Sequence, residues 1–90
     1  MISLEWDDRK RVINLAKHGI DFTRAVEAFN DRRNYEYRSD RDGEQRCVLI
    51  GQSKGDIIAV VFTLRPNAIR IISIRRARQE EVEKWQKNIL

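Results

Sequence analysis

The sequence has little of what several classes of protein depend on. Among its 90 residues are one cysteine, one histidine and one proline. A lone cysteine excludes a disulfide framework and a cysteine metal cluster, and a lone histidine excludes the histidine pairs that hold zinc. We therefore predict no bound metal and no cofactor, and we expect Cys47 to be a small apolar residue of a strand.

Long apolar segments are missing as well. No run approaches the roughly 20 residues that a membrane-spanning helix needs. The first ten residues carry acids where an export signal has apolar side chains. We therefore expect a cytoplasmic protein without a membrane partner. Ninety residues supply one hydrophobic core, so we predict a single domain over residues 1–90.

Charge is distributed unevenly along the chain. Residues 1–45 contain nine Lys and Arg against ten Asp and Glu, whereas residues 46–90 contain nine against four. No acid interrupts a late run of arginines, namely Arg65, Arg70, Arg75, Arg76 and Arg78. Because the guanidinium fork matches phosphate geometry, this run favours a polyanionic partner. A solvated basic face without a ligand explains the charge equally well.

The first third of the chain predicts a strand and two helices. Alternation over residues 2–6 indicates a short strand. Asp7 can cap a helix of about ten residues that ends before Gly19. Asp21 can cap a second helix, which ends near Asn30. The expected buried faces are Val12, Leu15 and Ala16 on the first helix, and Phe22, Ala25, Val26 and Phe29 on the second.

The rest of the chain predicts strands and a last helix. We expect an edge strand over 34–38 and a meander over 44–53, 56–65 and 69–76, with 57–62 in the central strand. Turns are expected at Lys54-Gly55 and Pro66-Asn67. Val82, Trp85 and Ile89 indicate a helix over about 78–88. The fold class is α+β, with two N-terminal helices packed on a mainly antiparallel sheet of four or five strands and a third helix at the C-terminus.

Strand alternation divides the late basic residues between two faces. Thr63 and Arg65 should share a face, as should Ser73 and Arg75, while Arg70 and Arg76 should share the opposite one. Arg75 and Arg76 must then diverge. At most one of the two is predicted to lie in a site, and the other to anchor the last helix or to lie at the rim.

Other ionisable residues have both structural and chemical interpretations. Glu44 and Arg46, two apart on a predicted strand, can form a salt bridge, or Glu44 can act as a general base. His18 and Lys17 end the first helix, where His18 is either a cap or a proton donor and phosphate contact. The two helices around His18-Gly19 also look like a helix-turn-helix, but the second offers few polar residues to a DNA groove.

One family resemblance covers most of the chain. It is carried by Glu5-Trp6-Asp7, Lys10, Asn14 to Gly19, Asp21-Phe22, Ala25, Phe29, Asp40 to Arg46, Ile50-Gly51, Arg70 to Ser73 and Arg75-Arg76-Ala77. This series of residues resembles the BrnT family of type II toxins. Two positions depart from the pattern of many relatives: Arg78 stands where a Ser or Thr could cap the last helix, and Ile74 stands where Ala is common.

The resemblance implies a RelE-like ribonuclease that arrests translation without a metal ion. It also implies neutralisation by a BrnA-type antitoxin with a ribbon-helix-helix portion, in a hetero-oligomer that binds operator DNA and represses the operon. We expect catalytic roles for Glu44, Arg65, Arg75, Arg76, Lys17 and His18, and RNA-binding roles for Lys10, Arg46 and Arg70. The alternatives are a non-catalytic module that binds RNA or the ribosome, and an interaction protein that docks an antitoxin.

Overall fold

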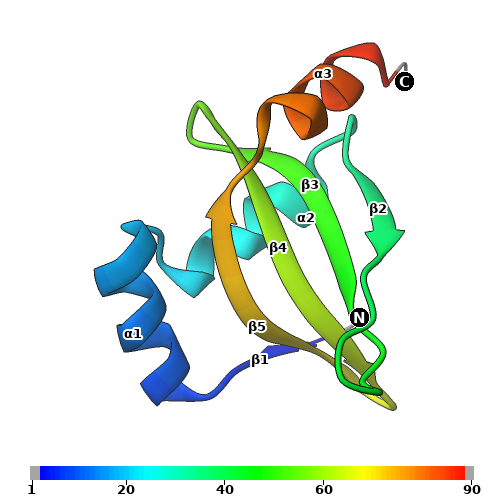
Figure 1. The fold of residues 1–90 in the computed structure, drawn as a ribbon. Helices are drawn as coiled ribbons and strands as arrows, with labels where there is room; N and C mark the ends of the chain where they lie inside the picture. Colours follow the sequence, from blue (N-terminus) through cyan, green and yellow to red (C-terminus); the bar gives the residue numbers. More distant parts are fainter. Residues whose placement is uncertain (1–2, 89–90) are drawn as a thin grey trace.

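A computed structural model describes residues 3–88 of the protein (Figure 1). Ile2 and Ile89, which were expected in the first strand and the last helix, lie outside these residues. None of the described helices has the length and apolar character that crossing a membrane requires.

Five strands form one sheet in the spatial order β1-β5-β4-β3-β2. Their bounds are Ser3–Glu5 for β1, Tyr35–Arg38 for β2, Cys47–Ser53 for β3, Asp56–Arg65 for β4 and Ala68–Arg76 for β5. All neighbours are antiparallel except β1 and β5, which are parallel. The apolar strand β4 lies in the centre, as predicted. The strand expected over 44–53 begins only at Cys47, so Glu44 belongs to a loop.

Helix α1 (Asp8–His18) lies beside β5 at one edge of the sheet (Figure 1). Asp7 caps its start by accepting from Arg9 N, and Gly19 ends it in the left-handed conformation at φ 71°. The second predicted helix is divided into a 3₁₀ turn, η1 (Phe22–Arg24), and the short helix α2 (Ala25–Asn30). Helix α3 (Gln79–Lys87) follows β5. The predicted α+β class is confirmed.

Helix α2 and the sheet enclose the main core. Phe22 and Ala28 are fully buried against the inner side chains of β3, β4 and β5, and Cys47 packs half-buried at the margin. A Cβ atom at Gly51 would stand 2.5 Å from the carbonyl oxygen of Ala28, so glycine lets α2 approach β3 directly. Val26, expected in the core, is 50% exposed because it lines an open hollow beside α2, together with Trp6 and Phe29.

The predicted apolar face of α1 is wrong. Val12 and Leu15 are 60% and 42% exposed, Ala16 is exposed, and the one buried side chain of α1 is Asn14. The Asn14 amide donates to Ile74 O at 2.9 Å and accepts from Ile74 N at 3.1 Å. It therefore pairs with β5 as a neighbouring strand would. Polar pairing to the strand edge, and not apolar burial, sets the rotation of α1.

The other face of the sheet is only partly covered, and we call it the open face. It carries a smaller core around Val48, Ile50 and Ala59. Helix α3 packs over one end through Trp85, and none of the described helices lies over the middle of the face (Figure 1). Figure 1 looks at this face, with α2 behind the sheet and α3 at the top.

A β-bulge in β5 changes which arginines share a face. Val61 pairs with Ser73 but Phe62 pairs with Ile71, so Ile72 has no partner on β4. The alternation restarts after Ile72, which explains why Ile71 and Ile74 are buried in the same core. Arg70 therefore shares the open face with Arg75. The prediction that Arg70 shares a face with Arg76 is wrong because it assumed an unbroken strand.

Candidate functional site

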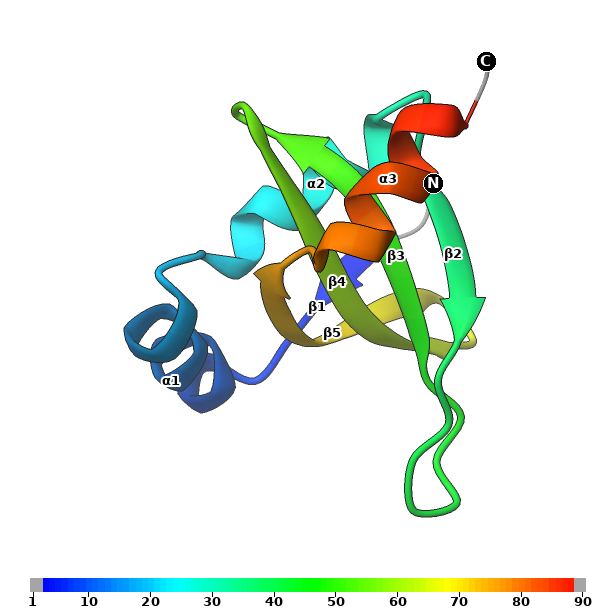
Figure 2. The ribbon, with the colours of Figure 1, turned by 45° about the horizontal axis from the view of Figure 1, so that its top comes forward.

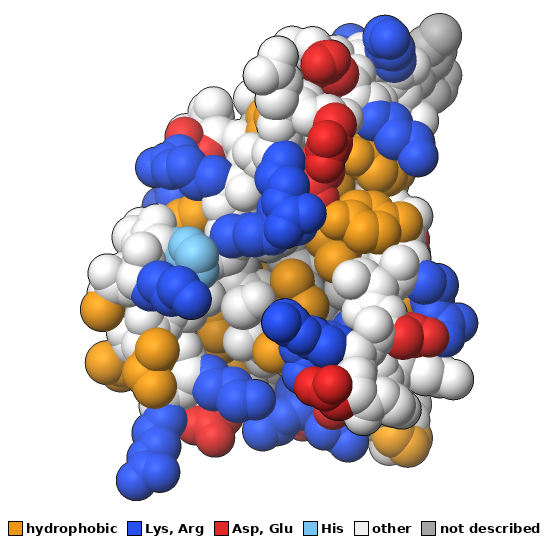
Figure 3. Space-filling view, in the orientation of Figure 1, with side chains coloured by type: hydrophobic (Ala, Val, Ile, Leu, Met, Phe, Trp, Pro, Cys, Tyr) orange, Lys and Arg blue, Asp and Glu red, His pale blue; other side chains and the backbone are white. Residues whose placement is uncertain are grey.

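A cleft of about 310 Å³ separates α1 from β5. It contains three of the residues singled out in the sequence, Lys10, Lys17 and His18, together with Ser73 of β5. The remaining lining is Ile13, Asn14 and Ile72. Figure 3 shows the histidine with a Lys or Arg side chain beside it, on the same side of the molecule as the open face. Two amines and an imidazole thus surround one hollow.

Local structure explains why these side chains meet. Lys10, Asn14, Lys17 and His18 follow the i, i+4, i+7, i+8 spacing of one helix face. The hydrogen bonds of Asn14 to Ile74 turn that face toward β5. The bulge at Ile72 then brings Ile72 and Ser73 to the cleft wall. The geometry of the cleft therefore depends on the side-chain amide of Asn14 and on the bulge residue Ile72.

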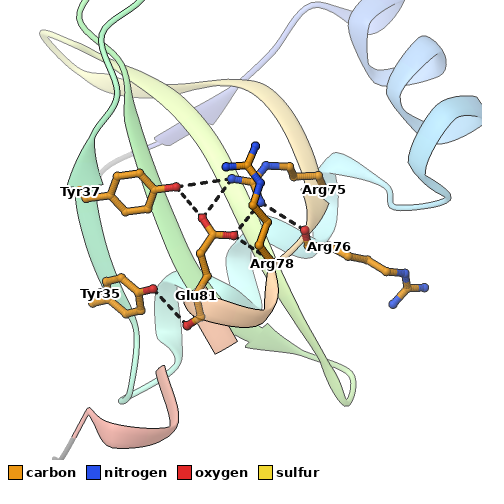
Figure 4. Close-up of polar contacts among 6 residues, drawn as sticks. All are labelled: Tyr35, Tyr37, Arg75, Arg76, Arg78 and Glu81. Atoms are coloured by element: carbon orange, nitrogen blue, oxygen red, sulfur yellow. Dashed lines mark hydrogen bonds and ion pairs between the residues drawn. The ribbon is translucent and has the colours of Figure 1, made fainter. Parts of the chain in front are cut away.

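Arg75 is held by a carboxylate of α3 at one end of the open face. Its two terminal nitrogens donate to the two oxygens of Glu81 at 2.7 and 3.0 Å. Tyr37 also donates to Glu81, and Arg75 reaches the Tyr37 oxygen at 3.5 Å (Figure 4). The Arg75 and Glu81 side chains are 21% and 6% exposed. Arg75 thus anchors α3, which is one of the two roles foreseen for this arginine pair.

Glu81 is the carboxylate at the centre of this network, where it accepts several hydrogen bonds. Burial would raise its pKa, but Arg75, the backbone of Arg78 and Tyr37 all donate to it and lower the pKa to about 2. Its Oε1 accepts from Arg78 N at 2.7 Å, which closes the first turn of α3 although position 78 has no Ser or Thr. The backbone carbonyl of Glu81 accepts from Tyr35. Glu81 therefore carries a negative charge throughout the neutral range.

Arg76 points away from Arg75 and lies at the rim, as the predicted divergence requires (Figure 4). It donates to Asp56 at 2.9 Å, and its side chain is 64% exposed. Asp56 also accepts from Arg24, at 2.9 Å. The Arg24 and Arg76 side chains, both donating to it, hold the pKa of Asp56 below its usual value. Arg76 thus belongs to the pairing that ties η1 to the start of β4.

The opposite end of the open face carries arginines with exposed partners. Arg46 donates to Glu44 at 2.7 Å, which confirms the salt bridge foreseen for these residues, and Arg70 donates to Glu5 at 3.4 Å. Arg65 has no ion pair among residues 3–88. Glu44 lies in the loop between β2 and β3, which projects from the sheet in Figure 2.

The predicted residues therefore form three groups. Lys10, Lys17 and His18 share the cleft. Arg46, Arg65 and Arg70 lie toward the end of the open face farther from α3, with Glu44 beyond them. Arg75 and Arg76 are engaged by carboxylates at the α3 end of the sheet, on opposite faces. In the described part of the chain, no three His, Cys, Asp or Glu side chains lie close enough to hold a metal ion.

Sequence reasoning missed Glu81 and Tyr37. One signal was available, since Glu81 stands three residues after the helix cap at Arg78, the spacing of a capping-box acid. The pairing of Glu81 with Arg75 has no such local signal, and Tyr37 is brought to both of them only by the sheet.

A second hollow, larger than the cleft beside α1, is chemically different. It has a volume of about 580 Å³ and lies beside α2, with a mostly apolar lining of Leu4, Trp6, Thr23, Val26, Phe29, Asn30 and Ile69. None of these side chains carries a charge. The smaller cleft beside α1 is therefore the better candidate for chemistry, despite its size.

The fold and the cleft define a class: a small α+β protein with cationic side chains on the open face of its sheet and in an adjoining cleft. Comparison with known families is consistent with this class. The family described as "Ribonuclease toxin, BrnT, of type II toxin-antitoxin system" matches residues 6–81. The chain belongs to this BrnT family of ribonuclease toxins. No curated protein matches the chain significantly.

Proposed function

We propose that residues 1–90 act as one toxin domain, a metal-independent endoribonuclease that cuts single-stranded RNA at the α1–β5 cleft. The observation that carries this proposal is the convergence of Lys10, Lys17 and His18 on one hollow at the edge of the open face. RNA crosses the open face, where Arg46, Arg65 and Arg70 contact its phosphates. The cytoplasm, where RNA is available, is the proposed site of action.

The reaction needs a base, an acid and positive charge around phosphorus. His18 accepts the proton of the 2′-hydroxyl as the general base, a role that histidine fills more often than any other side chain. The 2′-oxygen attacks phosphorus, the bond to O5′ breaks, and Lys17 as the ammonium gives a proton to O5′. The products are a 2′,3′-cyclic phosphate and a free 5′-hydroxyl. Proton transfers of this kind contribute about 10²- to 10⁴-fold to a rate.

Arginines and lysines supply the electrostatic part of the mechanism. Lys10 contacts the scissile phosphate from within the cleft, and preorganised cationic donors of this kind are worth about 10²- to 10³-fold each. Arg75, two positions along β5 from Ser73, is engaged by Glu81 and has a positioning role, since it fixes the end of β5 beside the cleft. Glu44 enters the proposal as the residue that holds Arg46, since it lies in the loop beyond β3, and not as the base.

The test is RNA cleavage by the purified chain with and without EDTA. We expect cleavage to persist in EDTA and to leave 2′,3′-cyclic phosphate ends. Lys17→Ala and His18→Gln should each lower the single-turnover rate by about 10²-fold or more while RNA binding is kept. Arg9→Ala is the matched control, because Arg9 is an exposed cation of the same helix that does not line the cleft.

Two results would contradict the proposal. Complete loss of cleavage in EDTA would place a metal ion in the mechanism. Binding of RNA without any cleavage by the wild-type chain would favour the non-catalytic RNA- or ribosome-binding alternative.

Membership of a type II toxin family supports a protein antitoxin as partner. We propose a BrnA-type antitoxin with a ribbon-helix-helix portion, whose hetero-oligomer with this chain binds operator DNA and represses the operon. Unpaired with it, the toxin arrests translation by cutting RNA. Growth arrest on expression of the chain alone, with rescue by the co-expressed antitoxin, tests this. Arrest that Lys17→Ala does not relieve would separate toxicity from RNA cleavage.

A further inference from the structure

One buried hydroxyl on the open face has no partner. Thr63 is 7% exposed, and its Oγ1 makes no hydrogen bond with any described residue. A buried hydroxyl left without a partner is unfavourable and uncommon. It therefore marks a position where a ligand atom or an ordered water completes the structure.

Two arginines flank this hydroxyl on the neighbouring strands. Thr63 and Arg70 are directly opposite each other in the β4–β5 ladder. On the other side the β3–β4 ladder ends at the pair Cys47–Phe62. Arg46 and Thr63 are the next residues beyond this last pair, on the same side of it. Thr63 of β4, Arg70 of β5 and Arg46, which directly precedes β3, form a row on the open face, because Phe62 and Cys47 pack into the core behind the sheet.

Each of the two guanidinium groups makes one hydrogen bond to a carboxylate and keeps its other N–H donors free for a ligand. Arg46 gives its Nε to Glu44, and Arg70 gives one terminal nitrogen to Glu5 across a long 3.4 Å contact. Most N–H donors of both groups therefore remain available. Glu44 and Glu5 are 48% and 44% exposed, more than the 25% and 34% of their arginines. These carboxylates can turn to water when an anion enters between the arginines.

We propose that Arg46, Thr63 and Arg70 form a phosphodiester-binding subsite for RNA, one step away from the cleft. The Thr63 hydroxyl donates to a non-bridging phosphate oxygen, and the two guanidinium groups grip the phosphate from either side. This inference rests on the proposed function, which supplies RNA as the ligand. It assigns to Thr63 a role that charge alone does not reveal.

The position of the row suits a strand of RNA that continues into the cleft. Val61 is two residues from Thr63 along β4 and pairs with Ser73, which lines the cleft. Two residues along a strand and one strand across separate the Thr63 and Ser73 Cα atoms by roughly 8 Å. The subsite and the cleft are therefore close enough to hold neighbouring phosphates of one chain.

Thr63→Val separates binding from folding. Valine has the shape of threonine without the hydroxyl, so the variant loses nothing that the free protein uses. We expect its unfolding midpoint in urea to equal or exceed that of wild type. Its affinity for a short 2′-O-methyl RNA oligonucleotide, which cannot be cut by 2′-oxygen attack, should fall about tenfold to a hundredfold. Thr63→Ser, which restores a hydroxyl, should bind close to wild type.

Each outcome of this experiment decides something. If the wild-type chain cuts RNA and Thr63→Val binds the oligonucleotide as tightly as wild type, the subsite is wrong and the ribonuclease proposal stands. If the wild-type chain does not cut RNA but Thr63→Val binds the oligonucleotide more weakly, the subsite stands and the ribonuclease proposal fails. A lowered unfolding midpoint for Thr63→Val, or no binding by wild type, would overturn the subsite.

Discussion

The two ends of the open face use arginine in different ways. At the α3 end, Arg75 donates both terminal nitrogens to Glu81, a carboxylate that is only 6% exposed. At the opposite end, the carboxylates that hold Arg46 and Arg70 are 48% and 44% exposed. A buried partner fixes its arginine as part of the fold, whereas an exposed partner can be exchanged for a phosphate. The burial of the carboxylate, not the presence of the arginine, thus separates scaffold from binding surface.

Removing the arginine at each end gives the largest expected contrast. Arg75→Ala leaves Glu81 buried without its partner, and should lower the free energy of unfolding by about 3 to 5 kcal/mol. Arg70→Ala leaves only an exposed Glu5, and should cost less than about 1 kcal/mol. Urea unfolding followed by circular dichroism measures both.

A double variant checks the cause of that contrast. In Arg75→Ala with Glu81→Gln, the buried charge disappears together with its partner, so part of the stability should return. Equal costs for Arg75→Ala and Arg70→Ala would contradict the distinction between the two ends.

Acid should weaken the α3 end in a defined range of pH. The pKa of Glu81 is about 2 in the folded protein, against an ordinary value of 4.5. A pKa lowered by folding means that the unfolded chain binds more protons in this range. Ionised Glu81 stabilises the folded protein fully above about pH 4.5, and this stabilisation is lost as the pH falls toward 2. The loss lowers the free energy of unfolding by about 3 kcal/mol.

Glu81→Gln provides the control for the acid effect. It keeps the size of the side chain and removes its titration, so the fall in unfolding free energy between about pH 5 and pH 2 should be smaller by about that amount. Asp21, whose pKa the Arg11 hydrogen bond lowers to about 2, titrates in both proteins and cancels in the difference. Identical pH profiles would show that Glu81 does not titrate as a buried partner of Arg75.

The salt dependence of RNA affinity should differ between variants at the two ends of the open face. Arg46→Ala and Arg70→Ala should each reduce the slope of log affinity against log salt by about one, because each removes a phosphate contact. Replacing Arg75 and Glu81 together by methionine removes a buried pair without changing net charge, and should leave the slope near wild type. Fluorescence anisotropy of the 2′-O-methyl oligonucleotide measures all three. A lower slope for the methionine pair alone would place the phosphates at the α3 end.

The fold could be predicted largely because its signals are local. The continuous apolar run of β4, the turn residues Lys54-Gly55 and the caps Asp7 and Asp21 each act within a few residues, and all were confirmed. Failures came where distant parts of the chain meet. Nothing near Val12 and Leu15 shows that Asn14 will pair with Ile74, 60 residues away, and so turn the apolar side of α1 outward.

The sequence predicted which types of residue form the candidate site, but not which of these residues lie together in the fold. Lysine, histidine and arginine at these positions favoured phosphate chemistry, yet the sequence did not show that Lys10 and His18 share a cleft or that Glu81 engages Arg75. The bulge at Ile72 is the plainest reason. Because Ile72 has no partner on β4, Arg70 lies on the same face as Arg75. A prediction from strict alternation places the two arginines on opposite faces.

The smallest expected effect concerns the arginine next to Arg75. Arg76 is 64% exposed and shares Asp56 with Arg24, which makes its own hydrogen bond to Asp56 at 2.9 Å. Arg76→Ala should therefore leave the unfolding midpoint unchanged within error, and should leave affinity for the oligonucleotide unchanged because its side chain points away from the open face. The adjacent residues Arg75 and Arg76 would then contribute to stability as differently as the arginines at the two ends of the open face do. If Arg76→Ala instead weakens RNA binding while Arg70→Ala does not, the RNA path runs past the rim at Asp56, and the open face loses its role.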